Sequence, residues 1–287
     1  MAEDNGDFGI RKIEKFSSQL PPGVVVLVGP PGTYKTTAAL SWPGVIKIYD
    51  FDIGVHRAWK IREKMADGLV HVVQVPVPKK SISTRWAKLE GFKETWRSFS
   101  DDFLASCEDP EVSTIVIDTG TLEWAMCCDA YLQELQEDQL TKAPNTPDSR
   151  LRKRLIQIEY GEPNSRQTSL FHAAKGYGKW LVFVTHEADE YVPVLNPNTN
   201  EPALDDSGNQ VFASNGKKKP DGFKRTVGMA DWMFWFREEE VESDGIKAGQ
   251  YITTIGKSGW GSDLMYMDIE NFELSKLEDR LKTLGRL

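Results

Sequence analysis

The chain has few of the residues that cross-link small secreted proteins or hold structural metals. Among its 287 residues there are three cysteines, Cys107, Cys127 and Cys128, and two of them are adjacent, so they cannot form a disulfide framework. We expect reduced, buried thiols, which are typical of an intracellular protein. His56, His71 and His172 lack the spacing of metal ligands and are interpreted as structural, and there is no Cys/His cluster of the kind that binds zinc.

Long apolar runs are also missing. No segment approaches the roughly 20 apolar residues that a membrane-spanning helix needs. The chain starts with the acidic segment 1–7, which argues against secretory and transit peptides. We therefore expect a cytoplasmic protein without a membrane partner.

Positive charge is in the minority. Lys and Arg number 35 against 43 Asp and Glu, and the formal net charge is −8. Binding of nucleic acid over the whole surface is not favoured, because phosphate contacts need Lys and Arg, although a local basic site is compatible with this total. Nine tryptophans exclude a disordered chain.

The length corresponds to one large domain or two small ones. We interpret residues 1–20 as a leader and 21–287 as a single domain. Within this domain, residues 188–228 are expected to form an inserted hairpin and a basic loop, and 270–287 to contain a C-terminal helix. Apolar, β-branched runs predict buried strands at 24–28, 45–49, 70–75, 113–118 and 181–185. Helices are expected from residue 35 onward and over 81–106, 120–138, 165–179 and 272–283.

Strands and helices alternate along the chain, which predicts an α/β fold with a mostly parallel sheet flanked by helices. Two late strands, 232–237 and 251–255, are expected to form a C-terminal β-hairpin that extends one edge of the sheet. The predicted helix 81–106 has the clearest pattern, with a stripe of apolar residues that should face the core. This stripe consists of residues 82, 86, 89, 92, 96, 99 and 103.

A glycine-containing turn follows the first strand and precedes the first helix, which is the order of a phosphate-binding loop. The turn contains Gly29, Pro30, Pro31, Gly32, Thr33, Tyr34, Lys35, Thr36 and Thr37. In such loops the backbone N–H groups and the helix N-terminus bind polyphosphate. We expect these residues to bind ATP, with Lys35 at the β- and γ-phosphates and the Thr36 hydroxyl on Mg²⁺.

Tyr34 departs from the pattern, because it stands where a second glycine is expected. A Cβ atom there is unfavourable if the backbone needs a positive φ or approaches a phosphate closely. Two explanations stay open: the loop has a geometry that a non-glycine residue tolerates, or Gly32 provides the flexibility. The alternative to nucleotide binding is a Pro-Gly turn before an ordinary helix.

Acidic residues and a histidine follow other strands, at the edge where open α/β sheets bind ligands. Asp118 ends the strand 113–118 and is expected to hold Mg²⁺ through water. Asp52, after the second strand, is our candidate for orienting the attacking water, and the alternative for its neighbour Asp50 is a turn cap. His186 follows the strand 181–185 and is expected to contact the γ-phosphate as a neutral donor, unless it is a structural histidine.

Five short motifs occur in order along residues 20–260: Gly29–Thr37, Asp50–Asp52, Ile115–Asp118, Tyr160-Gly161 with Asn164 and Arg166, and Val184–Glu187. This order resembles phage-encoded ATPases with a RecA-like core, described as AAA-domain or ATP-binding proteins, some of them linked to single-strand annealing and recombination. The resemblance implies a RecA-like P-loop NTPase core. It places Asp52 at the position of the catalytic acid, where the RecA family usually has Glu, and His186 at that of the γ-phosphate sensor.

Two basic segments stand out from the acidic total. Five basic and two acidic residues give residues 149–166 a charge of +3, and five basic residues and one acidic residue give residues 214–226 a charge of +4. The resemblance places DNA-binding loops near both segments. The candidate contacts to single-stranded DNA are Arg150, Arg152, Lys153, Arg154, Lys217, Lys218, Lys219, Lys224 and Arg225. Phe212 and Phe223 are expected to stack on unpaired bases. The alternative is that both segments are solvated loops.

The leading hypothesis is an Mg²⁺-dependent ATPase that is stimulated by single-stranded DNA and acts in phage recombination or replication. A nucleotide-binding switch or scaffold with a degenerate loop is the alternative, and a motor acting on duplex nucleic acid ranks last because no helicase signature is present. The resemblance also implies a homo-oligomer, as a ring or a filament. Lys257 is the candidate cation that reaches the neighbouring subunit's γ-phosphate, and a single-strand-binding protein is a candidate partner.

Overall fold

The computed structural model describes residues 20–58, 61–78, 88–196, 199, 201–205, 208, 210–243, 246–259 and 264–284. Apart from Leu20, the predicted leader lies outside these residues. None of the helices within the described ranges has the length and apolar character that crossing a lipid bilayer requires.

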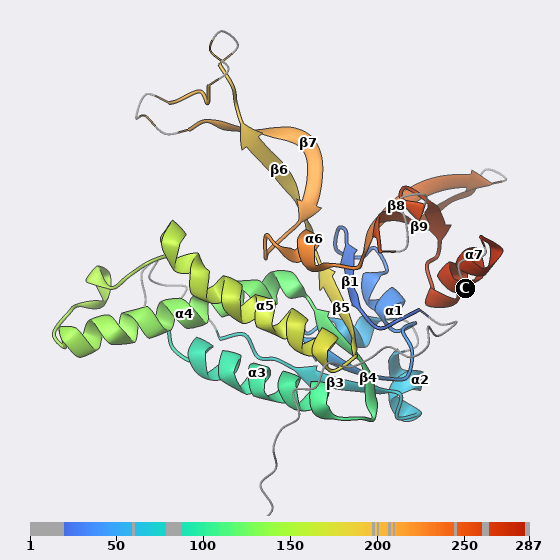
Figure 1. Ribbon diagram of the computed structural model, residues 1–287, viewed down its shortest axis with the longest axis horizontal. Helices are drawn as coiled ribbons and strands as arrows, with labels where there is room; N and C mark the ends of the chain where they lie inside the picture. Colours follow the sequence, from blue (N-terminus) through green and yellow to red (C-terminus); the bar gives the residue numbers. More distant parts are fainter. Residues whose placement is uncertain are drawn as a thin grey trace, which may run out of the picture.

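A mostly parallel sheet forms the centre of the structure (Figure 1). Its strands are β1 (Val24–Val28), β2 (Val45–Asp50), β3 (Val70–Gln74), β4 (Val112–Asp118), β5 (Trp180–Thr185), β8 (Trp232–Ser243), β9 (Ile246–Ser258) and β10 (Asp268–Glu270). The eight strands lie in the order β10-β9-β8-β1-β5-β4-β2-β3. From β8 to β3 the neighbours pair in parallel, and β9 and β10 add antiparallel strands at one edge. The predicted parallel sheet with an edge hairpin is therefore confirmed.

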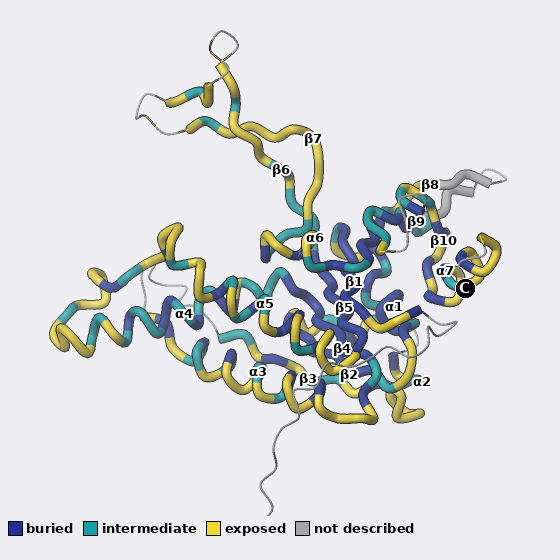
Figure 2. Tube along the Cα trace, viewed as in Figure 1, coloured by how far each residue is buried: buried dark blue, intermediate teal, exposed yellow. Residues whose placement is uncertain are grey.

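Helices cover both faces of this sheet. They are α1 (Lys35–Ala39), α2 (Ile61–Ala66), α3 (Phe92–Glu108), α4 (Gly120–Lys142), α5 (Gly161–Gly176), α6 (Thr226–Met229) and α7 (Leu274–Thr283), with short 3₁₀ segments η1 (Val55–Arg57), η2 (Asp148–Arg150) and η3 (Gln157–Tyr160). Because side chains alternate along a strand, Val24, Val26 and Val28 of β1 pack with α3, α4 and α5, and Val25 and Leu27 pack with α1, α2 and α7. Figure 2 shows the resulting concentration of buried residues along the sheet.

The helix α3 begins later than its apolar pattern predicts. It starts at Phe92 rather than at residue 81; residues 81–87 lie outside the described part, and 88–91 are not helical. Gly91 takes a left-handed conformation with φ 84° directly before the helix. Gln133 of α4 accepts hydrogen bonds from the N–H groups of Phe92 and Lys93 at 2.8 and 3.1 Å. The helix therefore starts where a neighbouring helix satisfies its free N–H groups.

Other boundaries also differ from the prediction. α4 continues to Lys142 rather than ending at residue 138, and α5 covers Gly161–Gly176 rather than 165–179. Pro163 lies in the first turn of α5, where its missing N–H costs nothing. Gly178 follows the helix with φ 67° and ends it. Cys107 and Cys127 are buried, Cys128 is half-buried, and no disulfide joins these three residues.

A two-stranded antiparallel arm stands away from the sheet (Figure 1). It consists of β6 (Glu187–Pro193) and β7 (Phe212–Pro220), so the predicted inserted hairpin is confirmed. The prediction of a basic loop is wrong for Lys217, Lys218 and Lys219, which lie within β7. Lys218 pairs across the ladder with Asp189, and this opposite-charge pair favours the strand over a loop.

A buried acid lies between two helices beneath the sheet. Glu123 of α4 is fully buried, and neither its carboxyl oxygens nor the amide atoms of the buried Gln167 on α5 form a hydrogen bond with any residue the structure describes. Burial raises the pKa of Glu123 from 4.5 to about 8, against a smaller opposite effect of the Gln167 amide. The carboxyl group is therefore protonated at neutral pH.

This burial makes the stability of the fold depend on pH. Because the folded protein binds the Glu123 proton more tightly than the unfolded chain, the free energy of unfolding falls as pH rises from 4.5 to about 8. We expect Glu123→Gln to remove this loss. The difference in the free energy of unfolding between variant and wild type should therefore shift in favour of the variant by up to about 5 kcal/mol as the pH rises from 4.5 to about 8. Urea unfolding at pH 5 to 9 measures the difference, with the exposed Glu111→Gln as the control. A difference that is constant with pH would contradict the prediction.

Candidate functional site

The carboxyl ends of four parallel strands meet at one edge of the sheet. Val28 of β1 is level with Thr185 of β5, Val184 of β5 with Asp118 of β4, and Asp118 with Asp50 of β2. The segments that follow these strands are therefore neighbours in space, although they are far apart in the sequence. They carry the glycine loop, Asp52, Asp118 and His186.

The loop after β1 folds around the Lys35 ammonium group. Lys35 is only 5% exposed, and its Nζ donates to the carbonyl oxygens of Gly29 at 2.9 Å and Pro30 at 2.6 Å, with the Thr33 hydroxyl at 3.4 Å. Gly32 has a left-handed backbone with φ 83°. The loop residues thus surround the ammonium, and its contact with phosphates stays a prediction.

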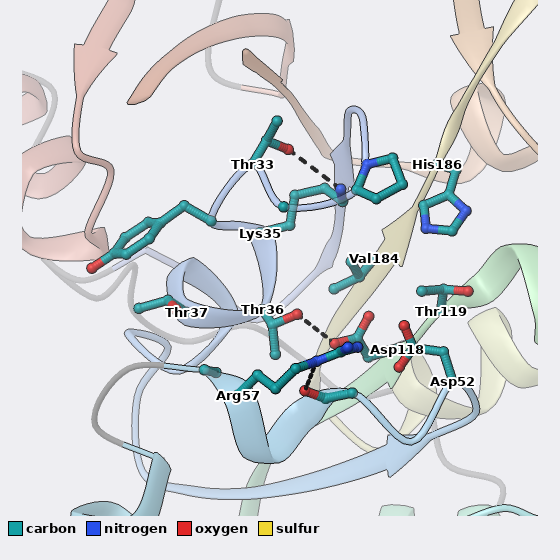
Figure 3. A pocket seen from close by; sticks show the side chains of 15 residues that line it. Thr33, Lys35, Thr36, Thr37, Asp52, Arg57, Asp118, Thr119, Val184 and His186 are labelled. Carbon is teal, nitrogen blue, oxygen red and sulfur yellow. Dashed lines mark hydrogen bonds between the residues drawn. The ribbon is translucent and has the colours of Figure 1, made fainter. Parts of the chain in front are cut away.

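A hydrogen bond joins the loop to the strand β4. The Thr36 hydroxyl donates to Oδ2 of Asp118 at 2.6 Å, and Asp118 is 3% exposed (Figure 3). Burial raises the pKa of Asp118 to about 7, the hydrogen bond from Thr36 lowers it, and the charges of Asp52 and Asp50 raise it further. The two residues predicted to hold the metal are therefore adjacent, in a place where three carboxylates lie near the buried cation Lys35.

Tyr34 adopts the conformation of the glycine that it replaces. Its φ is 71° and its ψ is 5°, in the left-handed region, which costs about 1–2 kcal/mol for a residue with a Cβ. Its ring leaves the loop and stacks on Tyr251 of β9, with centroids 5.4 Å apart and planes 15° apart. Both Gly32 and Tyr34 are left-handed, so Gly32 does not replace the missing glycine.

The two acids after β2 differ in their surroundings. Asp50 is buried and accepts hydrogen bonds from the N–H groups of Gly54 at 3.1 Å and Val55 at 3.3 Å, so it caps the turn. Burial raises the pKa of Asp50, and the neighbouring Asp52 raises it further. Asp52 is exposed and lines the cavity at the strand ends, so it is the acid within reach of a ligand.

His186 connects this edge with the root of the arm. Its side chain lines the cavity, and its backbone N–H donates to the Thr121 hydroxyl at 3.1 Å. The Thr185 hydroxyl donates to the Asp221 carbonyl at 2.6 Å, and Asp221 in turn donates to the His186 carbonyl at 2.9 Å. Burial and the charge of Lys35 lower the pKa of His186, which favours its neutral form at pH 7.

These segments enclose a cavity of 520 Å³, a volume that suits a small-molecule ligand. Sequence reasoning missed Arg57 and Thr119, which line this cavity together with Lys35. A basic residue shortly after a strand that ends in an acid is the signal that would have found Arg57. No group of three or more His, Cys, Asp or Glu side chains in the described ranges has the arrangement of a protein-only metal site.

The predicted nucleic-acid contacts are spread over two regions. Arg150 and Arg152 line a hollow at the end of α4, and Arg152 forms an ion pair with Glu159. Lys153 and Arg154 are exposed in the segment that joins α4 to α5. Lys224 and Arg225 are exposed near the root of the arm. Lys217 and Lys219 are exposed on β7, whereas Lys218 contacts Asp189 at 2.8 Å.

One sequence-based interpretation changes here, and the trans role of Lys257 stays a prediction. Phe223 is 1% exposed and packs on Trp124 and Phe171, so the prediction that it stacks on bases is wrong; Phe212 is 52% exposed. The Lys257 ammonium donates to the Val227 carbonyl at 2.8 Å, and it lines a different cavity from the one at the loop.

Comparison with models of known protein families gives no match, and comparison with curated proteins gives no significant match. The fold and the geometry of this edge therefore carry the functional argument.

The left-handed Tyr34 has a measurable effect on stability. We expect Tyr34→Ala to be less stable than Tyr34→Gly by about 1 kcal/mol, because alanine keeps the cost of a positive φ and glycine removes it. Urea unfolding of the two variants measures this difference.

Tyr251→Ala, alone and combined with Tyr34→Ala, serves as the control for the ring stack. The double-mutant cycle should give a coupling of about 0.5–1.5 kcal/mol between the two rings. Equal stability of the alanine and glycine variants would contradict the left-handed assignment.

Proposed function

We propose that this protein binds Mg²⁺-ATP at the edge formed by β1, β4 and β5 and hydrolyses it, with a RecA-like core that acts on single-stranded DNA. The observation that carries the proposal is the 2.6 Å hydrogen bond from Thr36 to the buried Asp118, next to a loop that surrounds Lys35. This is the pairing expected of a metal-binding hydroxyl in a phosphate loop and the acid at the end of another strand of the same sheet.

The residues at this edge fit a magnesium ion. Mg²⁺ prefers oxygen ligands, and in nucleotide sites it uses one or two protein groups together with phosphates and water. Thr36 and Asp118 would provide the protein oxygens. Burial raises the pKa of Asp118 most, the charges of Asp52 and Asp50 raise it further, and a bound cation would offset both effects. When bound with ATP, Mg²⁺ neutralises charge that develops on the phosphates.

The other residues of the cavity have roles that follow from their surroundings. Lys35 would exchange its loop carbonyls for β- and γ-phosphate oxygens, because its ammonium already lies within the loop. Asp52 is exposed in the cavity, and it would orient the attacking water and accept its proton. The neutral His186 would donate to the γ-phosphate.

The nucleoside has a place beside the loop. A second cavity of 240 Å³ shares Tyr34 and Thr37 with the first and is also lined by Lys64 and Glu273. Thr37 follows the metal-binding threonine, so a chain of phosphates leaving the loop would enter this cavity. The carboxylate of Glu273 would accept a hydrogen bond from a ribose hydroxyl or a base amino group.

The arm is our candidate for the contact with single-stranded DNA. Lys219 points to the face of β7 opposite Lys218, because successive residues of a regular strand alternate, and Lys217 lies where the register of the ladder shifts. Neither Lys217 nor Lys219 forms an ion pair with any residue in the described part of the chain, so their charges are available to phosphates. Thr185 and Asp221 tie the root of this arm to the ATP site.

A nucleotide switch that hydrolyses slowly is the second candidate, and the left-handed Tyr34 favours it. A loop with tyrosine at this position cannot be as compact as a loop with glycine. The stack of Tyr34 on Tyr251 also holds the loop in one position. ATP binding without turnover would identify this function.

Steady-state hydrolysis tests the proposal directly. The wild type should hydrolyse ATP with Mg²⁺, and a long oligo-dT should increase the rate. Lys35→Ala should lose both ATP binding and turnover, because the cavity then lacks its buried cation. Unchanged ATP affinity in this variant would contradict the loop assignment.

Asp52→Asn is the companion variant. It should bind ATP as the wild type does but lose most turnover, because the amide cannot accept the proton of the attacking water. Circular dichroism of both variants controls for folding.

The lysines of the arm allow a matched test of DNA binding. Replacing Lys217 and Lys219 with Gln should weaken binding to oligo-dT and reduce the slope of log K against log salt by up to about 1.4, at about 0.7 for each phosphate contact. Fluorescence anisotropy between 50 and 300 mM salt, roughly the range in which such slopes are resolved, measures it.

Lys218→Gln is the control, because Asp189 already neutralises Lys218 and its loss should change the slope less. Equal slopes for the wild type and the double variant would assign these lysines to solubility.

A further inference from the structure

Arg57 enters the cavity from the side opposite the loop. It ends η1, after β2, and Figure 3 shows its side chain reaching toward Asp118, between Thr36 and Asp52. Lys35, the first residue of α1, reaches the same cavity from the loop after β1. Lys35 and Arg57, two cations of one chain, therefore line the same cavity from different elements.

The turn that carries Arg57 is fixed to the end of β2. The buried Asp50 accepts hydrogen bonds from the N–H groups of Gly54 and Val55, and the Arg57 backbone N–H donates to the Gly54 carbonyl at 3.0 Å. Nε of Arg57 lies 3.4 Å from the same carbonyl. The arginine is thus positioned by the strand that also positions Asp52.

Gly54 makes room for this arrangement. A Cβ atom there would lie 2.5 Å from Nη2 of Arg57 and 2.6 Å from Oδ1 of Asp52. The φ of Gly54 is −108°, which other residues adopt readily, so the requirement is for space and not for backbone freedom. A Cβ atom at this position would displace the ends of both side chains from where they lie in this structure.

The charge of Arg57 is available to a ligand. Within the described ranges no carboxylate lies at ion-pairing distance from its guanidinium, whereas Arg152, Arg166 and Arg237 all have such partners. A guanidinium offers several N–H donors in one plane and suits contacts to phosphate oxygens. An exposed, unpaired guanidinium that points into a cavity beside a phosphate loop therefore fits an anionic ligand.

We propose that Arg57 contacts the γ-phosphate of ATP bound to its own chain and stabilises the charge of the transition state. The inference rests on the proposed function. In the reaction, the oxygen of a water molecule bonds to the γ-phosphorus, the bond to the bridging oxygen breaks, and its electron pair stays on ADP. The proton of the water goes to Asp52. Arg57 donates N–H groups to the γ-phosphate oxygens, on which negative charge is concentrated.

This assignment makes a cation from a neighbouring subunit unnecessary for the chemical step. It differs from the trans role predicted for Lys257, whose ammonium contacts the carbonyls at α6. A chain that carries both Lys35 and Arg57 is complete in itself.

Arg57→Ala tests the contact, with Arg62→Ala as the matched control, because Arg62 is exposed on α2 and does not line the cavity. We expect turnover to fall about 1,000-fold in Arg57→Ala, as is typical when such an arginine is lost. ATP affinity should fall while ADP affinity stays the same, measured by calorimetry with Mg²⁺. Arg62→Ala should match the wild type in all three.

Gly54→Ala is a second variant that leaves Arg57 in the sequence but displaces it. It should also lower turnover and ATP affinity without changing ADP affinity. If both variants keep the turnover, the ATP affinity and the ADP affinity of the wild type, the inference is overturned. In that case, ATP binding that still depends on Lys35 would leave the proposed function intact.

Mixing Arg57→Ala with Lys35→Ala separates cis from trans action. Neither chain has both cations, so a cis arginine predicts no recovery of turnover at any ratio. Recovery in the mixture would show that Arg57 acts on the neighbouring chain and would overturn the inference. If the wild type binds no ATP, the proposed function itself fails.

Discussion

The hydrogen bond between Thr36 and Asp118 constrains the whole edge of the sheet. Asp118 ends β4, and Thr36 lies in α1 after β1; β5 separates these two strands, which are therefore about 10 Å apart. The loop after β1 must reach across the end of β5 to make this contact, and the backbone carbonyl of Asp118 also accepts a hydrogen bond from Phe51 after β2. One buried aspartate therefore holds the segments after three strands together.

Charge is distributed unevenly around this aspartate. Asp50 and Asp118 are buried, and Lys35 is the buried cation beside them. Burial lowers the pKa of Lys35 to about 8 while it raises the pKa values of both acids. Each of these shifts means that the charged form of the group lacks solvation. A bound cation together with polyphosphate would stabilise these charged forms, which the folded chain alone does not.

Local patterns in the sequence were sufficient for much of this edge. The apolar runs of β1, β4 and β5 and the acids or polar groups at their ends predict both the strands and their shared edge, because parallel strands end on the same side. The loop residues are consecutive, so their chemistry is readable without the fold. The start of α3 could not be predicted from local sequence, because it depends on Gln133 of another helix.

Contacts between distant residues explain the other differences. Nothing near Tyr34 in the sequence indicates Tyr251, yet that ring provides the packing for a tyrosine in a glycine position. Phe223 lies beside lysines, so the sequence favours exposure, but the aromatic residues Trp124 and Phe171 bury it. The basic run on β7 has the composition of a loop, and only the acids of β6 across the ladder make it a strand.

The arm begins and ends at one point of the body, since Glu187 at the start of β6 pairs with Pro220 at the end of β7. Opposed residues of an antiparallel ladder have Cα atoms about 5 Å apart, which a tight turn of a few residues spans. The strands of the sheet and the phosphate loop do not depend on the length of chain between these two residues. The arm is thus a modular insertion, which could be shortened, lengthened or exchanged during evolution while the proposed nucleotide site beneath it kept its geometry.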